Sequence, residues 1–137
     1  MKCLLICSLN KQILWVSPLY PGHVHDFTIF KQHCAGTAFS KLRVHVDLGF
    51  LGIHHHIVAR EILIPHKNYR KRPLTDQQKA ENTARSRLRV VVENVFAKMK
   101  SFFVLRIKNR MKDKSRLQQA IGDCALLSNF KSMTISR

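Results

Sequence analysis

The sequence predicts an α/β protein, and three features lead to that prediction. Two short apolar segments, Leu4–Ser8 and Ile13–Ser17, flank a polar turn, which is the pattern of a β-hairpin. The segment Lys41–Asp47 alternates apolar and polar residues, as a half-buried strand does. Apolar residues then recur at helical spacing through Arg85–Phe103. Strands and helices in this order along one chain indicate an α/β or α+β fold.

Length and charge limit the possible functions. With 137 residues the chain is long enough for one core, and we expect residues 1–137 to form a single domain. Lys and Arg number 24 against eight acids, which gives a formal net charge of +16. A domain with that imbalance repels itself unless a polyanion is bound, so nucleic acid is the expected partner. We expect no membrane partner, because no segment approaches the length of a transmembrane helix.

Local signals predict the elements between the hairpin and the central helix. Asp26 precedes an apolar stretch and is expected to be the N-cap of a short helix that ends near His33. The segment His54–Arg60 is expected to form a second short helix, and Ile62–Ile64 a short strand. A basic loop then follows over His66–Pro73.

The second half of the chain is predicted to be helical. Thr75 stands three residues before Gln78, which is the spacing of a capping box at the start of a helix. That helix is expected to continue into the amphipathic segment Arg85–Phe103. A last helix is predicted over Ser115–Phe130, where apolar residues again share one face.

Two acids are the strongest candidates for chemistry. Asp47 ends an apolar strand, where α/β folds place ligand-binding groups, although an Asp ahead of Gly49 also suits a turn. Glu93 is the sole acid of the central helix and lies between Arg89 and Lys100 at the margin of the apolar arc. It is therefore either an ion-pair partner of Arg89 or a metal ligand. Together the two carboxylates are hard oxygen ligands that suit Mg²⁺ or Mn²⁺.

Other common chemistries have little support in the sequence. The histidines and the four cysteines lack the paired spacing of a zinc site, so reduced thiols in a cytoplasmic protein are expected. No P-loop, dinucleotide fingerprint or nucleophile elbow is present in the sequence. Nucleotide hydrolysis and esterase chemistry therefore have no motif to carry them.

Three motifs resemble a known family. They are WVSPLYPGHVHDFTIF, VDLGF and LTDQQKAENTARSRLRVVVENVFAKMKSFFVLR, and they occur in the right order from about Cys7 to about Arg110. They are similar to the C-terminal part of the catalytic domain of DDE transposases, of the insertion-sequence and Harbinger type. The resemblance implies an RNase H-like fold in which three carboxylates hold two Mg²⁺ ions. It also implies cleavage of DNA at transposon ends and transfer of the 3′ hydroxyl to a target strand.

The resemblance assigns roles to particular residues. Asp47 in VDLGF matches the second catalytic Asp, and Glu93 matches the third carboxylate, so both are expected catalytic residues and metal ligands. Arg89 and Lys100, at the family's spacing around Glu93, are implied to contact DNA phosphates. We expect further phosphate contacts from a helical arginine and from two cations of the basic loop: Arg85, Lys71 and Arg72.

The sequence also departs from the family. No residue within 1–10 can replace the first catalytic Asp, so we expect a partial fold that lacks the first strand. Residues 1–64 would carry the second Asp in the sheet half, and residues 74–130 would carry the Glu in the helical half. We expect a truncated or split-frame transposase that is inactive alone. Its expected partners are the upstream polypeptide or a second copy of the chain. The alternative is a non-catalytic basic protein that binds nucleic acid.

Overall fold

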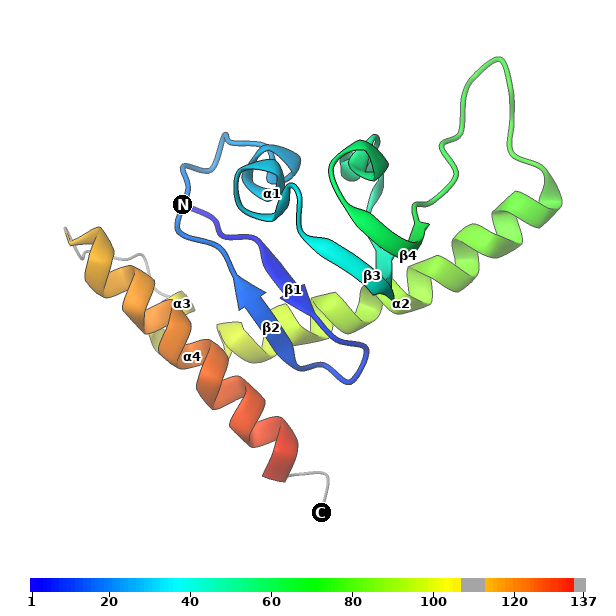
Figure 1. Ribbon diagram of the computed structural model, residues 1–137. Coiled ribbons are helices and arrows are strands. Elements are labelled where there is room, and N and C mark those ends of the chain that lie inside the picture. Colours follow the sequence, from blue (N-terminus) through cyan, green and yellow to red (C-terminus); the bar gives the residue numbers. More distant parts are fainter. Residues whose placement is uncertain (107–112, 135–137) are drawn as a thin grey trace. The chain divides into compact units, whose positions relative to one another are not determined.

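The computed structural model describes residues 1–106 and 113–134, and it confirms the α/β class (Figure 1). The end of the stretch that resembles the family, at residues 107–110, lies outside the described residues. In chain order the elements are β1 (Leu5–Cys7), β2 (Ile13–Val16), α1 (Asp26–Cys34), β3 (Ala38–His45), η1 (Leu48–Phe50), η2 (Ile53–His55), β4 (Val58–Leu63), α2 (Asp76–Lys100), α3 (Phe103–Arg106) and α4 (Lys114–Thr134).

The chain divides into two compact units, and α2 contributes to both. Unit 1 is Met1–Gly22 with Arg89–Arg137, and unit 2 is His23–Leu88. This division differs from the expected halves, residues 1–64 and residues 74–130. The reason is that the hairpin packs with the second half of α2 and with α4. That residues 1–137 form a single domain stays a prediction.

Unit 1 is built on the predicted hairpin, whose strands β1 and β2 pair antiparallel with Leu5 opposite Val16. Lys11 in the connecting turn has a φ of 63°, the left-handed conformation that a tight turn requires. The helix α4 runs beside the hairpin (Figure 1), and the Asn129 amide bonds both polar groups of the Ile13 backbone, at 2.7 and 2.9 Å. The core of this unit combines hairpin and helix residues: Leu5, Ile13, Val95, Met99, Ile121, Cys124 and Ala125.

Unit 2 contains a parallel strand pair, β3 with β4, in which Val44 lies opposite Ile62. In the described residues these strands pair only with each other, and most of β3 is exposed. Parallel strands are normally covered on both faces, so this arrangement is consistent with a partial RNase H-like fold. The helix α1 packs Ile29 and Phe30 inward, and the ring of Phe30 meets that of Phe50 edge-to-face at 5.9 Å.

Two helix predictions are confirmed, the capping box and the last helix. The capping box forms as expected: the Gln78 N–H donates to Thr75 Oγ1 at 3.2 Å, and the Thr75 N–H donates to Gln78 Oε1 at 3.1 Å. The last helix is present as α4. No helix in the ranges 1–106 and 113–134 is both long and apolar enough to cross a membrane.

The predicted helix His54–Arg60 is wrong. Only a single 3₁₀ turn forms there, and β4 begins at Val58, several residues before the predicted strand Ile62–Ile64. The reason is non-local: Gly52, with a φ of 89°, turns the chain, and Val58 then pairs with Ala38 across the sheet. Strand pairing between distant residues outweighs a weak local helix preference.

Two helix ends also differ from the predictions. His25, not Asp26, occupies the N-cap position of α1, because the His25 carbonyl accepts the first helical bonds from Thr28 and Ile29. Asp26 instead lies in the first turn, where its charge still suits the helix dipole. The central helix ends at Lys100, where the Ser101 hydroxyl donates to the Lys98 carbonyl at 2.7 Å.

The end of α2 changes the expected apolar arc. Phe103, which was predicted to face the core, starts the separate turn α3 and is 73% exposed. Val95 and Met99 are buried as the helical spacing predicted. The arc therefore holds at Val95 and Met99, and it fails at Val92, which is 37% exposed, as well as at Phe103.

Candidate metal and nucleic-acid site

Asp47 follows the carboxyl end of the parallel pair in unit 2. The ladder extends as far as Val46, whose N–H donates to the Leu63 carbonyl at 3.1 Å. Asp47 is exposed and extended, and its Oδ1 accepts the Leu48 N–H at 2.8 Å as the N-cap of η1. Both sequence-based interpretations therefore apply locally: the carboxylate stands at a strand end, and it also organises a turn.

Glu93 lies on α2 in unit 1. Its side chain is 62% exposed, and Oε1 is 3.3 Å from Nε of Arg89, one helical turn earlier. This is the ion pair that the spacing predicted. In water-exposed positions such a pair contributes only a few tenths of a kcal/mol, so it does not compel the carboxylate to stay with the arginine. Lys100, the other predicted neighbour, is exposed at the end of the same helix.

The basic loop between β4 and α2 projects beyond both elements (Figure 1). Its tip is a tight turn in which the Arg72 N–H donates to the Tyr69 carbonyl at 3.0 Å. Lys71 and Arg72 are exposed, and neither side chain pairs with another described residue. Lys67 holds its ammonium 5.2 Å from the centre of the Tyr69 ring. The loop thus concentrates cations around one aromatic side chain.

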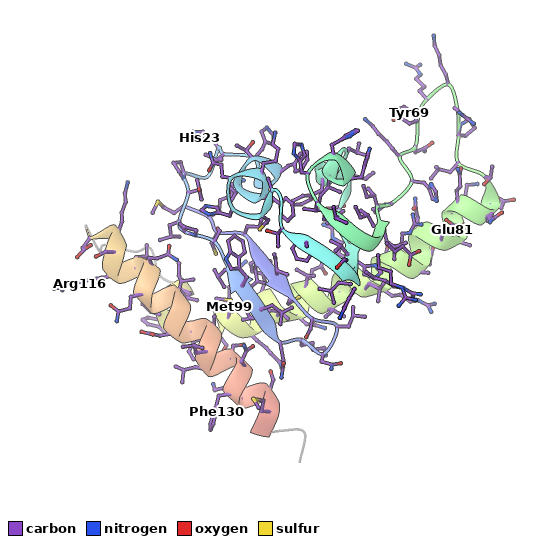
Figure 2. All side chains as sticks on the ribbon, viewed as in Figure 1. His23, Tyr69, Glu81, Met99, Arg116 and Phe130 are labelled. Atoms are coloured by element: carbon purple, nitrogen blue, oxygen red, sulfur yellow. The ribbon has the colours of Figure 1, made fainter. Side chains whose placement is uncertain are left out.

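Three side chains of α2 hold the base of this loop, and we call them the loop anchor: Glu81, Asn82 and Arg85. The Asn82 amide exchanges two hydrogen bonds with the His66 backbone, at 2.8 and 2.9 Å. Glu81 Oε2 lies 2.7 Å from His66 Nε2, and the Arg85 guanidinium donates to the Ile64 carbonyl at 2.6 Å. Figure 2 labels Glu81 on α2 and Tyr69 on the loop.

The loop anchor bears on two sequence predictions. Arg85, predicted to contact DNA, has a side chain only 20% exposed and also lies 3.4 Å from Glu81 Oε2. The hydrogen bond from His66 is the main cause that lowers the pKa of Glu81. Sequence reasoning placed Glu81 only at a helix start and did not single out Asn82. The available signal was weak: an acid and an arginine at i,i+4 indicate a pair but not its distant partners.

The comparison with protein families shows to which family the chain belongs. Residues 1–129 match the family described as DDE superfamily endonuclease. The chain belongs to this family. A probable transposase for insertion sequence element IS702, from Microchaete diplosiphon, is 36% identical over 85 residues, which are 61% of this chain and 29% of that relative. The chain thus aligns with less than a third of the relative's length. No solved structure matches this chain.

DDE superfamily endonucleases act on DNA and generally use divalent metal ions, so the donor set of this chain was tested for a metal. No group of three or more His, Cys, Asp and Glu side chains suited to a metal ion occurs within residues 1–106 and 113–134. Asp47 and Glu93 nevertheless have the right chemistry, because both are exposed carboxylates with hard oxygen donors. The donor type fits a divalent ion, and these two residues alone do not make a full set.

Proposed function

We propose that this chain acts in DNA transposition, as part of the catalytic domain of a DDE transposase. The match to the DDE superfamily endonucleases over residues 1–129 is the observation that carries the proposal. The similarity to a probable insertion-sequence transposase supports it. The net charge of +16 provides the electrostatic attraction that a DNA partner requires. Such a protein would act at the nucleoid of a bacterium or in a eukaryotic nucleus.

In this proposal Asp47 and Glu93 are the metal ligands and the catalytic carboxylates. Mg²⁺ or Mn²⁺, when bound, would polarise the phosphate and help to generate the attacking hydroxide or alkoxide. The role of the protein side chains is to hold the ion. Glu93 must then exchange its 3.3 Å contact with Arg89 for the ion, which is possible because exposed pairs are weak.

DNA phosphates are the proposed partners of the exposed cations. Lys71 and Arg72 at the loop tip and Lys100 at the end of α2 have no partner among the described side chains, so they are available for phosphate. Arg89 would turn to phosphate when Glu93 binds metal. Arg85 also donates to the Ile64 carbonyl, so we propose that it positions the loop, and its contact with DNA stays a prediction.

We further propose that the 137 residues do not cleave DNA by themselves. They supply two of the three carboxylates that the family uses, and the loss of one member of a cooperating catalytic unit removes most activity. A carboxylate from outside these 137 residues, in another transposase segment or in a second copy, would have to complete the donor set.

Metal titration and a nicking assay together test this function. We expect weak Mn²⁺ binding in calorimetry, reduced at least tenfold in Asp47→Asn and Glu93→Gln, and no nicking of supercoiled DNA above background. Glu61→Gln is the matched control, because Glu61 is an exposed acid paired with an arginine at 3.0 Å, as Glu93 is at 3.3 Å. Unchanged Mn²⁺ affinity in both site variants would contradict the metal assignment. Nicking that is lost in Asp47→Asn would contradict the predicted inactivity.

A non-catalytic DNA-binding protein is the second candidate. The ion pair between Arg89 and Glu93 favours this second candidate, because the pair gives the Glu93 carboxylate a purely structural role. This candidate predicts salt-sensitive DNA binding that neither Mn²⁺ nor Glu93→Gln alters. The titration above therefore distinguishes the two functions.

A further inference from the structure

A hollow of about 380 Å³ lies entirely within unit 2, between the basic loop, the start of α2 and Leu51. Its walls are mainly apolar and include Ile64, Pro65 and Pro73. Ligand pockets range from about 300 to 1,000 Å³, so this one is at the small end and suits a group the size of one base. None of the acids assigned to metal binding lines it.

The chemistry around the hollow is that of a base-stacking site. Tyr69 lines it and is 54% exposed, so its ring offers apolar surface to a ligand. Lys67 and Arg72 also line it, and Lys67 lies 5.2 Å from the Tyr69 ring centre. An aromatic ring beside cations is the arrangement with which proteins hold an unpaired nucleotide, because the ring stacks on the base and the cations neutralise its phosphate.

One wall of the hollow is held by hydrogen bonds before any ligand arrives. Ile64 and His66, two of its lining residues, are held by the loop anchor through the contacts at 2.6 to 2.9 Å described above. A preorganised wall lowers the ordering cost of binding. An apolar protein side chain is a poorer occupant, since the cations at the rim favour a ligand that carries negative charge.

We propose that this hollow binds a single unpaired nucleotide of DNA, with the base on Tyr69 and a flanking phosphate on Arg72 and Lys67. The inference rests on the proposed DNA-binding function and specifies a subsite for it. The subsite would direct the chain to DNA with an unpaired base beside a duplex, rather than to continuous double helix.

The test compares two DNA probes that differ in one nucleotide. One is a blunt duplex, and the other carries a single unpaired 2-aminopurine, whose fluorescence is quenched by stacking. We expect the chain to bind the second probe more tightly and to quench it. Tyr69→Ala should reduce that preference by about 5- to 150-fold, the range for loss of one base–aromatic stack, and Tyr69→Phe should retain it.

Two further variants make the test specific. Leu51→Trp keeps Tyr69 and every cation but fills the hollow, so it should remove the preference while duplex binding stays unchanged. Phe130→Ala removes an aromatic side chain that is 68% exposed in unit 1 and should have no effect. Circular dichroism and urea unfolding confirm that each variant is folded.

The possible results distinguish failure of the nucleotide subsite from failure of the proposed function. Equal affinity for both probes, or a Tyr69→Ala loss that is the same for both, would overturn the nucleotide subsite and leave DNA binding intact. A preference that survives Leu51→Trp would also overturn it. No binding to either probe at low salt would instead overturn the proposed function.

Discussion

Glu81 illustrates how much a single acidic residue can organise. It accepts from His66, Gln77 and Arg85, although its side chain is 40% exposed. Asp47 accepts a turn N–H, and Glu93 forms an exposed ion pair with Arg89. Because an exposed pair is weak, Glu93 can change partners, whereas Glu81 is built into the fold.

The lowered pKa of Glu81 predicts how the loop responds to acid. The hydrogen bond from His66 holds the pKa below its ordinary value of 4.5. Because the folded form has the lower pKa, its stabilising effect is complete above pH 4.5 and is lost as pH falls through the folded pKa. We expect Glu81→Gln to flatten this part of the pH profile of the urea unfolding free energy. The control Glu61→Gln should keep the wild-type profile, and an unchanged profile in Glu81→Gln would contradict the role of the carboxylate.

At the scale of elements, α2 is the helix of unit 2 whose first turns position the basic loop. The capping box fixes where the helix starts, and the loop anchor ties residues 64–66 to the helix side. The tip of the loop carries the cations and is not held in this way. A firm base with an exposed tip is suited to presenting positive charge in a defined direction.

Asn82→Ala should release the base of the loop. It removes two hydrogen bonds to the His66 backbone, and leaving those groups unpaired costs about 1–3 kcal/mol. We expect faster tryptic cleavage within residues 67–72 and faster amide exchange at His66. Asn94→Ala is the matched control on the same helix, since Asn94 is exposed. Equal cleavage rates in both variants would show that the anchor does not hold the loop.

Thr75→Ala should weaken the start of α2. Loss of an N-cap hydroxyl costs about 0.5–2 kcal/mol, measured here as a fall in the urea unfolding free energy. Thr83→Ala provides the contrast, because Thr83 lies inside the helix, where alanine is the better helix former and stability should be kept or raised. A neutral Thr75→Ala would mean that the capping box is not significant in solution.

On the scale of the whole molecule, charge is the dominant property. The formal net charge of +16 predicts DNA binding that weakens steeply with salt. Replacing both Lys71 and Arg72 by Gln removes two proposed phosphate contacts. The slope of log K against log salt should then become shallower by about 1.8, since each contact contributes about 0.9.

The control for this experiment removes the same amount of charge from a different place. Lys31→Gln with Lys41→Gln removes the same charge from exposed positions outside the loop. We expect it to alter the slope much less. Equal slopes for the two double variants, measured by fluorescence anisotropy over a salt series, would show that the loop has no special part in DNA binding.

The sequence alone determined the features that depend on near neighbours. The hairpin, the capping box at Thr75 and the last helix were predictable because their signals lie within a few residues of one another. The family motifs, and with them Asp47 and Glu93 as candidates, were also evident from the sequence. The i,i+4 pair of Glu93 with Arg89 followed from helical spacing.

Only the tertiary structure decided the features that join distant residues. Strand β4 forms where a helix was predicted because Val58 pairs with Ala38, and no local pattern encodes that pairing. The loop anchor joins Asn82 to His66 across 16 residues, and it also ties the Arg85 guanidinium, a predicted DNA contact, to the Ile64 carbonyl. Local propensity sets which conformations are low in free energy, but long-range hydrogen bonds and burial choose among them. The basic loop was evident from the sequence, and its anchoring and its hollow became evident only in three dimensions.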